Sequence, residues 1–387
     1  MTADAHSILA PSSAERAVPC PASVKLERWA LATPAPNGDL VTADTIEAAE
    51  GIAAHWALAE MLYGREPTVG ARAPNGVFLT DEMIEGAGIM AEDVEVTLIP
   101  HGLKPTDGAI EVAVNIPRTH ELCWGTPDYR VWLPASAMGR PTLALWDFKF
   151  GHRIVEVFEN WQCLDYASGC VSATKLSDLN VDVIATIVQP RGYHRAGPVR
   201  RWRFNMADAR GLVNIRSNTA HEALGPDPKA RPGPHCRDCI ARHACPTLQR
   251  AGYAAMDEAG KALPLELTPE AMGIELRMLR EARKRIEARE SGLEEQILGT
   301  IKRGGSVPGW AIEHGAGRQR WKLPDAHIIA VGQMLGINVA KPPEAVTPLQ
   351  ASKLGLPTEH LAGLIDTPRS AATLVPDDGA RARKVFG

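Results

Sequence analysis

The stretch Pro141-Thr142-Leu143-Ala144-Leu145-Trp146-Asp147-Phe148-Lys149-Phe150 is an apolar run interrupted by one acid and one amine. The apolar run predicts a buried strand. Asp147 and Lys149 lie two residues apart, so on a strand their side chains point to the same face. A carboxylate and an ammonium on a buried strand cost free energy unless they pair or take part in chemistry. This strand is therefore the strongest candidate for a functional element. The alternative is an ordinary ion pair on an exposed edge strand.

Composition narrows the class of protein. The chain has 387 residues and a formal net charge of −4, which predicts one large or two ordinary domains and restricts any DNA contact to local basic patches. Its short, charge-interrupted apolar runs predict no membrane span. The first twenty residues lack the basic start and apolar core of a secretory signal. The seven cysteines are therefore expected to bind metal or to lie buried as thiols rather than to form disulfides.

Periodicity and turn residues predict alternating helices and strands. Apolar spacing predicts a helix over 43–62, and the β-branched run predicts a core strand over 181–188. Residues 63–90 are rich in Gly and Pro and are predicted to be loop, followed by a strand over 94–99. A long helix is predicted from Thr268-Pro269 to about Lys302, because proline suits the first helical position.

A second carboxylate follows the turn Gly125-Thr126-Pro127, which fixes Asp128 beside the next strand. Two carboxylates on adjacent strands, Asp128 and Asp147, make an oxygen site suited to Mg²⁺ or Mn²⁺. Such an ion polarises a phosphodiester and lowers the pKa of a bound water. His55, on the helix over 43–62, would supply a third ligand. Lys149 would orient or help deprotonate the nucleophile and stabilise negative charge. The alternative for His55 is a core histidine with its hydrogen bonds satisfied.

Two further polar residues follow the candidate strand. Gln162 and Tyr166 are four residues apart, so on a helix they share one face. An amide and a phenol in this place could contact the metal shell or the DNA backbone near the scissile phosphate. The alternative is a polar helix face with a half-buried tyrosine.

The cysteines form the second cluster of candidate ligands. Cys236, Cys239 and Cys245 lie within ten residues, with a proline directly after the last, and Cys20 is the natural fourth ligand. Four thiolates favour a [4Fe–4S] cluster with a structural role, joining the N-terminal segment to the C-terminal edge of the domain. The alternative is zinc, held by the three clustered cysteines with His235, His243 or Cys20. The remaining three cysteines are expected to be core thiols.

The order His55, Gly125-Thr126-Pro127-Asp128, Asp147-Phe148-Lys149 and Gln162-x-x-x-Tyr166 resembles the motifs of RecB-type PD-(D/E)XK nucleases. Together with the four cysteines, it resembles their iron–sulfur branch, shared by AddAB-type helicase–nucleases and CRISPR-associated adaptation exonucleases. The whole chain is similar to a phage- or prophage-encoded family of this branch. The motif match covers residues 15–250. One departure is Asp147, where many members have Glu, and the shorter side chain puts the metal geometry in question.

The resemblance implies an α/β fold with a PD-(D/E)XK restriction-endonuclease-like core, a mixed central sheet flanked by helices. The helix start at Thr268-Pro269, with strands, loops and short helices expected after it, predicts a C-terminal α+β accessory section over 265–366 and a flexible tail over 367–387. The resemblance implies a nuclease domain over 1–255. It also implies a hydrolase, a metal-dependent DNA exonuclease, with His55, Asp128 and Asp147 as metal ligands. Lys149 would be the catalytic lysine, and Gln162 and Tyr166 the motif that follows it.

The biological setting that the resemblance implies is phage recombination or DNA-end processing in the cytoplasm of a bacterial host. The expected partners are DNA and a phage single-strand annealing or DNA-binding protein, with no membrane. The alternative is a non-catalytic DNA-binding or assembly protein that keeps the nuclease fold and a structural zinc or iron–sulfur site.

Basic residues cluster at two places that suit phosphate contact and base stacking. The predicted DNA-binding residues are Arg191, Arg195, Arg200, Arg201, Arg318, Arg320 and Trp321. The alternative is that they are solvated turn residues. The helix predicted after Thr268 has mixed charge and a rough apolar stripe. This pattern favours a packed accessory helix or an oligomer contact over a DNA reader. The stripe contains Leu276, Leu279, Ile286, Leu293 and Ile297.

Overall fold

The computed structural model describes residues 7–33, 46–135, 139–177, 181–259, 268–312 and 325–334. The chain divides into two compact units, residues 1–312 and 313–387. In the second unit, the described element is helix α9 (Asp325–Met334). The predicted strands of the accessory section, the predicted tail, and Arg318, Arg320 and Trp321 lie outside the described residues.

The first unit is built on a five-stranded sheet in the order β1-β4-β5-β6-β7. β5 and β6 pair in parallel, and the connection between them contains α5 (Trp161–Ser172). The other neighbouring strands pair antiparallel. The predicted mixed sheet flanked by helices is therefore confirmed. The strands are β1 (Ala109–Ile110), β4 (Tyr129–Leu133), β5 (Thr142–Phe148), β6 (Asp182–Val188) and β7 (Val199–Asn205), with β2 (Val114–Asn115) and β3 (Trp124–Gly125) in a separate pair.

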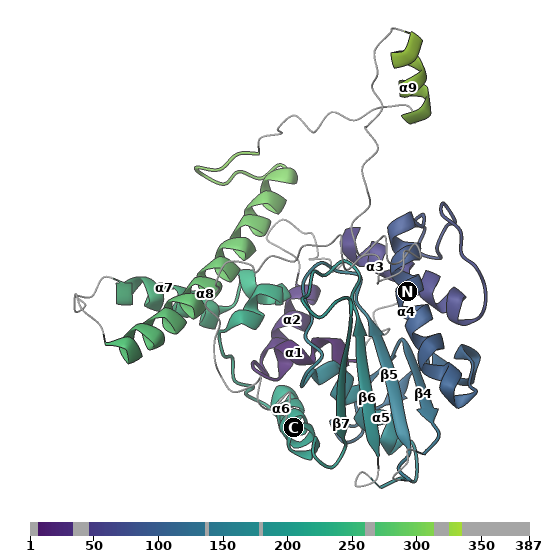
Figure 1. The fold of residues 1–387 in the computed structure, drawn as a ribbon. Helices are drawn as coiled ribbons and strands as arrows, with labels where there is room; N and C mark the ends of the chain where they lie inside the picture. Colours follow the sequence, from purple (N-terminus) through teal and green to yellow (C-terminus); the bar gives the residue numbers. More distant parts are fainter. Residues whose placement is uncertain are drawn as a thin grey trace. The chain divides into compact units, whose positions relative to one another are not determined.

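Helices cover both faces of this sheet, which is why all seven residues of β5 are buried (Figure 1). Leu143 and Leu145 pack into one core with α5 and α6 (Arg210–Leu224). Trp146 and Phe148 pack into a second core with α3 (Ile46–Leu62) and α4 (Asp81–Leu98). Alternation along one strand therefore supplies two hydrophobic cores.

Helix α4 corrects two predictions, because residues 81–90 are not loop and Val94–Leu98 is not strand. The Thr80 side chain caps the helix by accepting a hydrogen bond from the Met83 amide. The glycines that suggested a loop have a different explanation. A Cβ at Gly86 would lie 2.9 Å from Pro190 Cγ, so glycine lets α4 approach the chain beyond β6 closely.

The remaining helices of the first unit precede α3, follow α4 or follow α6. Thr268 caps α8 through a hydrogen bond from the Ala271 amide, and Pro269 is its first residue, as predicted. Within the described residues, no helix is long and apolar enough to cross a membrane. The helices are η1 (Pro11–Ser13), α1 (Ala14–Ala17), α2 (Ser23–Ala32), η2 (Ile99–His101), η3 (Pro105–Asp107), η5 (Pro234–Asp238), η6 (Ile240–His243), α7 (Pro246–Ala259) and α8 (Pro269–Lys302).

Candidate active site

The candidate residues meet at the C-terminal end of β5, where the strand leaves the sheet. Asp147 is the penultimate residue of β5, and the Lys149 amide still bonds the Val188 carbonyl of β6 at 2.9 Å. Asp128 directly precedes the antiparallel neighbour β4. The sheet therefore brings both carboxylates to the same end of adjacent strands.

Asp147, Lys149 and Gln162 form one hydrogen-bonded triangle. The Lys149 ammonium lies 2.9 Å from Asp147 Oδ2 and donates to Gln162 Oε1 at 2.8 Å. The Gln162 amide donates to Asp147 Oδ1 at 2.8 Å and to the Tyr166 hydroxyl at 3.2 Å. The predicted helix face of Gln162 and Tyr166 thus reaches the Asp-x-Lys pair, and Gln162 holds both of its members in place.

His55 reaches the site from α3 and contacts Asp128. His55 Nδ1 lies 3.1 Å from Asp128 Oδ1, and its ring meets Phe148 edge to face. The other carboxylate oxygen of Asp128 accepts the Phe148 amide at 2.6 Å. Asp128 is therefore fixed to both the helix and the candidate strand.

Burial and neighbouring charges set the protonation of the site. Burial raises the pKa of Asp147, with a further rise from Asp128, and Lys149 offsets only part of it. Burial alone would lower the pKa of Lys149, but the two carboxylates raise it above its ordinary value. Lys149 is therefore a cation at neutral pH, suited to stabilising negative charge rather than to accepting a proton.

The fit of a divalent cation can be judged from the carboxylate oxygens. Asp147 Oδ2 is buried and accepts no hydrogen bond, although it is paired with the Lys149 charge. In the described part of the chain, no three His, Cys, Asp or Glu side chains are preassembled as a metal site. Asp128 contacts His55 instead, and Asp147 contacts Lys149. The two close carboxylates fit a hard cation, which would replace some of these internal contacts.

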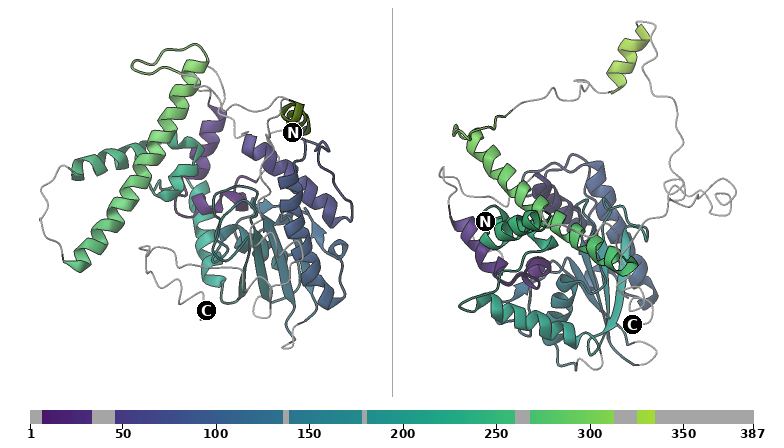
Figure 2. Two further views of the ribbon diagram at one scale, coloured as in Figure 1. Left: turned by 45° about the horizontal axis from the view of Figure 1, so that its top comes forward. Right: turned by 90° about the vertical axis from the view of Figure 1, so that its left-hand side faces the viewer.

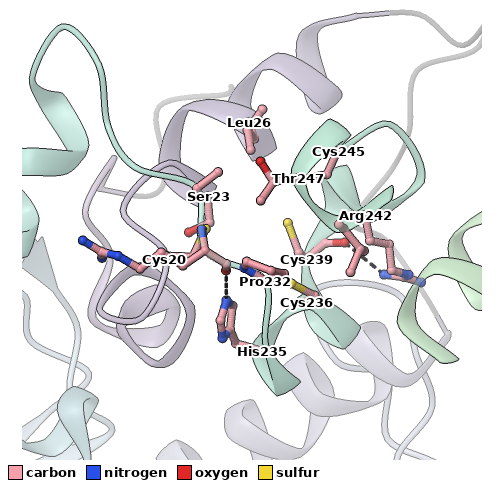
Figure 3. Close-up of a pocket in the computed structure, with 13 residues that line it drawn as sticks. Cys20, Ser23, Leu26, Pro232, His235, Cys236, Cys239, Arg242, Cys245 and Thr247 are labelled. Carbon is pink, nitrogen blue, oxygen red and sulfur yellow. Dashed lines mark hydrogen bonds between the residues drawn. The ribbon is translucent and has the colours of Figure 1, made fainter. Parts of the chain in front are cut away.

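The four predicted cluster cysteines line one pocket (Figure 3). Cys20 comes from the turn before α2, and the other three come from η5, the residue after it and the residue before α7. Burial raises the pKa of Cys236, and Cys20 and Cys245 raise it further. Burial also raises the pKa of Cys239 to about 12. The four thiols line one pocket, but among the described residues they are not preassembled as a metal site. A metal or cluster would have to draw them together as thiolates.

Backbone groups around the pocket also suit a cluster. The Arg231 amide donates to Cys20 Sγ and the Gly233 amide to Cys236 Sγ, both at 3.4 Å. Such N–H···S bonds are among the contacts that tune iron–sulfur clusters. His235 also lines the pocket, but its Nε2 lies 2.9 Å from the Arg231 carbonyl. His243 is not among the lining residues. Cys123, Cys163 and Cys170 are buried in the core.

The predicted DNA-binding residues of the described chain have different surroundings. Arg191 bonds Glu50 and Glu82 and stacks over Phe150, with its carbon Cζ 3.9 Å from the ring centre. Arg200 is buried and donates to Gln189 and to the Val155 carbonyl. Arg201 is paired with Asp93, whereas Arg195 is exposed. The first three arginines hold elements together, and Arg195 is open to solvent.

Two acidic residues lie near the site although no motif or spacing in the sequence predicts them there. Glu111 has a backbone φ of 48°, a strained conformation for a residue other than glycine. Burial raises its pKa, and so does the nearby Asp128. Glu15 of α1 accepts the Trp161 amide at 3.2 Å, and burial raises its pKa against the opposing charge of Lys149. Both are brought to the site by chain folding, so local spacing could not identify them.

A comparison with curated proteins finds no match to this chain. A comparison with family models finds one that spans nearly the whole chain, residues 6–382. The chain belongs to that family, described as "Protein of unknown function (DUF2800)".

Proposed function

We propose that this chain is a divalent-metal-dependent deoxyribonuclease of the PD-(D/E)XK type, acting as an exonuclease in DNA-end processing. The observation that carries the proposal is the convergence of His55, Asp128, Asp147, Lys149 and Gln162 at the end of β5. They come from α3, the turn before β4, β5 and α5, segments that share no local reason to meet. The ordered motifs of the sequence thus have a spatial counterpart.

Each residue has a role that follows from its contacts. Asp128 and Asp147 would hold Mg²⁺ or Mn²⁺, which supplies a polarised phosphodiester and an acidified water. Lys149 stays charged and stabilises the negative charge that develops on the phosphate. His55 keeps Asp128 ionised and oriented, and would bind the metal only through Nε2, because Nδ1 faces Asp128. Gln162 positions both Asp147 and Lys149, and Tyr166 positions Gln162.

The proposed cofactor of the cysteine pocket is a [4Fe–4S] cluster with a structural role, and the rival is zinc. The proposed substrate is DNA, reached through exposed cations such as Arg195, in phage recombination within a bacterial host cell. A phage single-strand annealing or DNA-binding protein is the proposed acceptor of the processed ends.

The test uses end-labelled single- and double-stranded DNA, with the purified chain and Mg²⁺ or Mn²⁺. We expect the wild-type protein to degrade the labelled DNA from its ends. Asp147→Asn and Lys149→Met should each lower the rate by about 10²–10³-fold or more, because each removes charge from the reacting centre.

Lys175→Met is the matched control, since Lys175 is exposed beyond the end of α5, and it should keep wild-type activity. Circular dichroism would show that the site variants are folded. An inactive wild type in every metal, with DNA binding retained, would overturn the proposal in favour of a non-catalytic DNA-binding or assembly protein.

A further inference from the structure

Helix α8 has one face packed on its own unit and one face without a partner among the described residues. Its packed face includes Ala288 and Gly292, the two buried residues of the helix. A Cβ at Gly292 would lie 3.0 Å from the His243 amide nitrogen, so this face is closely fitted to η6. α7 lies beside α8, and both helices lie at the outside of the unit (Figure 2).

The opposite face of α8 carries an apolar stripe. At 100° per residue, Leu279 lies about 180° from Ala288, and Leu279 is 59% exposed. Met272 and Leu293 are also exposed, at 51% and 38%. The other apolar members of the stripe are half-buried. Three exposed apolar residues on one line, on a helix whose other face is already packed, indicate a protein contact. The stripe consists of Met272, Leu276, Leu279, Ile286, Leu293, Ile297 and Ile301, with Glu275, Arg283 and Glu290 as its charged members.

The order of this stripe is symmetric about Ile286. Leu279 and Leu293 lie seven residues before and after it, and Leu276 and Ile297 lie ten before and eleven after. The two charges nearest the centre have opposite sign and lie on opposite sides of it, Arg283 three residues before Ile286 and Glu290 four residues after. A second α8 laid antiparallel, Ile286 against Ile286, therefore places Leu279 beside Leu293 and Arg283 beside Glu290 on both sides of the centre.

Charge also decides the direction of pairing. In a parallel pair each Arg283 would face Arg283, and each Glu290 would face Glu290, which is repulsive. Arg283 forms an exposed ion pair with Glu287, one turn on, at 3.2 Å. Such a surface pair is weak and does not prevent contact with Glu290 of another chain.

A groove at the C-terminal end of α8 supports the same arrangement. Ile297, Leu298 and Ile301 line it on one side and Trp310 on the other. In the antiparallel pair, Leu276 and Met272 of the second copy come level with residues 296 and 300. They would enter this groove beside Trp310, which is 62% exposed.

We infer that α8 is a homodimerisation helix, pairing antiparallel with α8 of a second copy of this chain about a two-fold axis at Ile286. The interface is isologous, so each copy gives the same surface and receives its complement. It uses the face of α8 opposite Ala288, which packs with Cys236, so the second copy does not cover the cysteine pocket.

The test is sedimentation velocity on the full chain across a concentration series. We expect a dimer, which Leu279→Asp combined with Leu293→Asp converts to monomer. Arg283→Glu should weaken the dimer at least about tenfold, because it puts like charges beside Glu290. Adding Glu290→Arg to Arg283→Glu should restore it, since the antiparallel pair regains opposite charges.

Val96→Asp is the matched control, an exposed apolar residue at 60% on the surface of α4, and it should remain dimeric. Circular dichroism at 222 nm would show that the stripe variants keep α8. A wild type that stays monomeric, or a dimer that survives the Leu279/Leu293 change, would overturn the inference. So would a dimer indifferent to Arg283→Glu.

Discussion

At the scale of single residues, the His55–Asp128 pair links the site to stability. Burial alone would lower the pKa of His55, but Asp128 raises it above 6.5. Burial alone would raise the pKa of Asp128, but His55 lowers it below 3.8. The histidine term is fully present below pH 6.5 and is lost as pH rises through the folded pKa. The aspartate term is present above pH 3.8 and is lost as pH falls through its folded pKa.

The pair should therefore stabilise the fold most between about pH 4 and 6.5. We expect His55→Gln to lower the free energy of unfolding by roughly 1–3 kcal/mol at about pH 5.5. The loss should be smaller near pH 9, because the contribution of the pair is lost as pH rises through the raised pKa of His55. Urea unfolding at the two pH values in metal-free buffer measures this. A loss of equal size at both values would show that the ion pair contributes nothing.

The residues of the site were predictable from the sequence to the extent that their chemistry was local. Asp147 and Lys149 share a strand face by spacing, and Gln162 and Tyr166 share a helix face, and the structure shows both pairs in contact with one network. Their partners were not predictable, because His55 bonding Asp128 depends on the packing of α3 on the sheet. The place of Glu111 near the site depends on its backbone φ of 48°, and no residue type in the sequence predicts that conformation.

At the scale of elements, two glycines of α4 should respond in opposite ways to the same change. Gly88→Ala should stabilise the chain by about 1 kcal/mol, because nothing lies within 4 Å of the added methyl group and alanine favours helix. Gly86→Ala should destabilise it by roughly 1–3 kcal/mol, because the methyl group would lie 2.9 Å from the rigid Pro190 ring. Chemical unfolding of the two variants and the wild type measures the free energy of unfolding of each. Equal changes in the two variants would refute the close approach of α4 to Pro190.

The same glycines explain where prediction of the elements failed. β5, β6 and α8 were found because burial on both faces gives a continuous apolar run, and because Thr268-Pro269 marks a helix start. In α4 the glycines resembled loop residues and the run from Val94 resembled a strand. The helical signal was present in Met83, Met90 and Leu98, all buried on one face. The tertiary contact with Pro190, which justifies glycine there, is not visible in the sequence.

At the scale of the whole molecule, the cysteine pocket joins segments that are far apart in the chain. Cys20 adjoins α2, and Cys236 packs with Leu248 of α7 and Ala288 of α8. A cluster bound there would link α2 to α7 and α8, and the exposed face of α8 carries the apolar stripe. Its loss should therefore affect the stability of the first unit and, through α8, the dimer.

We expect Cys20→Ala and Cys245→Ala each to abolish iron binding, removing the brown colour and the absorbance near 400 nm of anaerobically purified protein. Losing one long-range cross-link costs about 3 kcal/mol, which lowers the melting temperature by roughly 5–10 °C. Cys170→Ala is the control, because Cys170 is buried in the central core beyond the pocket; it should keep its iron even where it loses packing. A colourless wild-type protein that contains one zinc ion per chain would show that the pocket binds zinc and not an iron–sulfur cluster. A wild type containing neither metal, with the Cys20 variant as stable as its parent, would leave the four thiols without a metal and remove the link between α2 and α8.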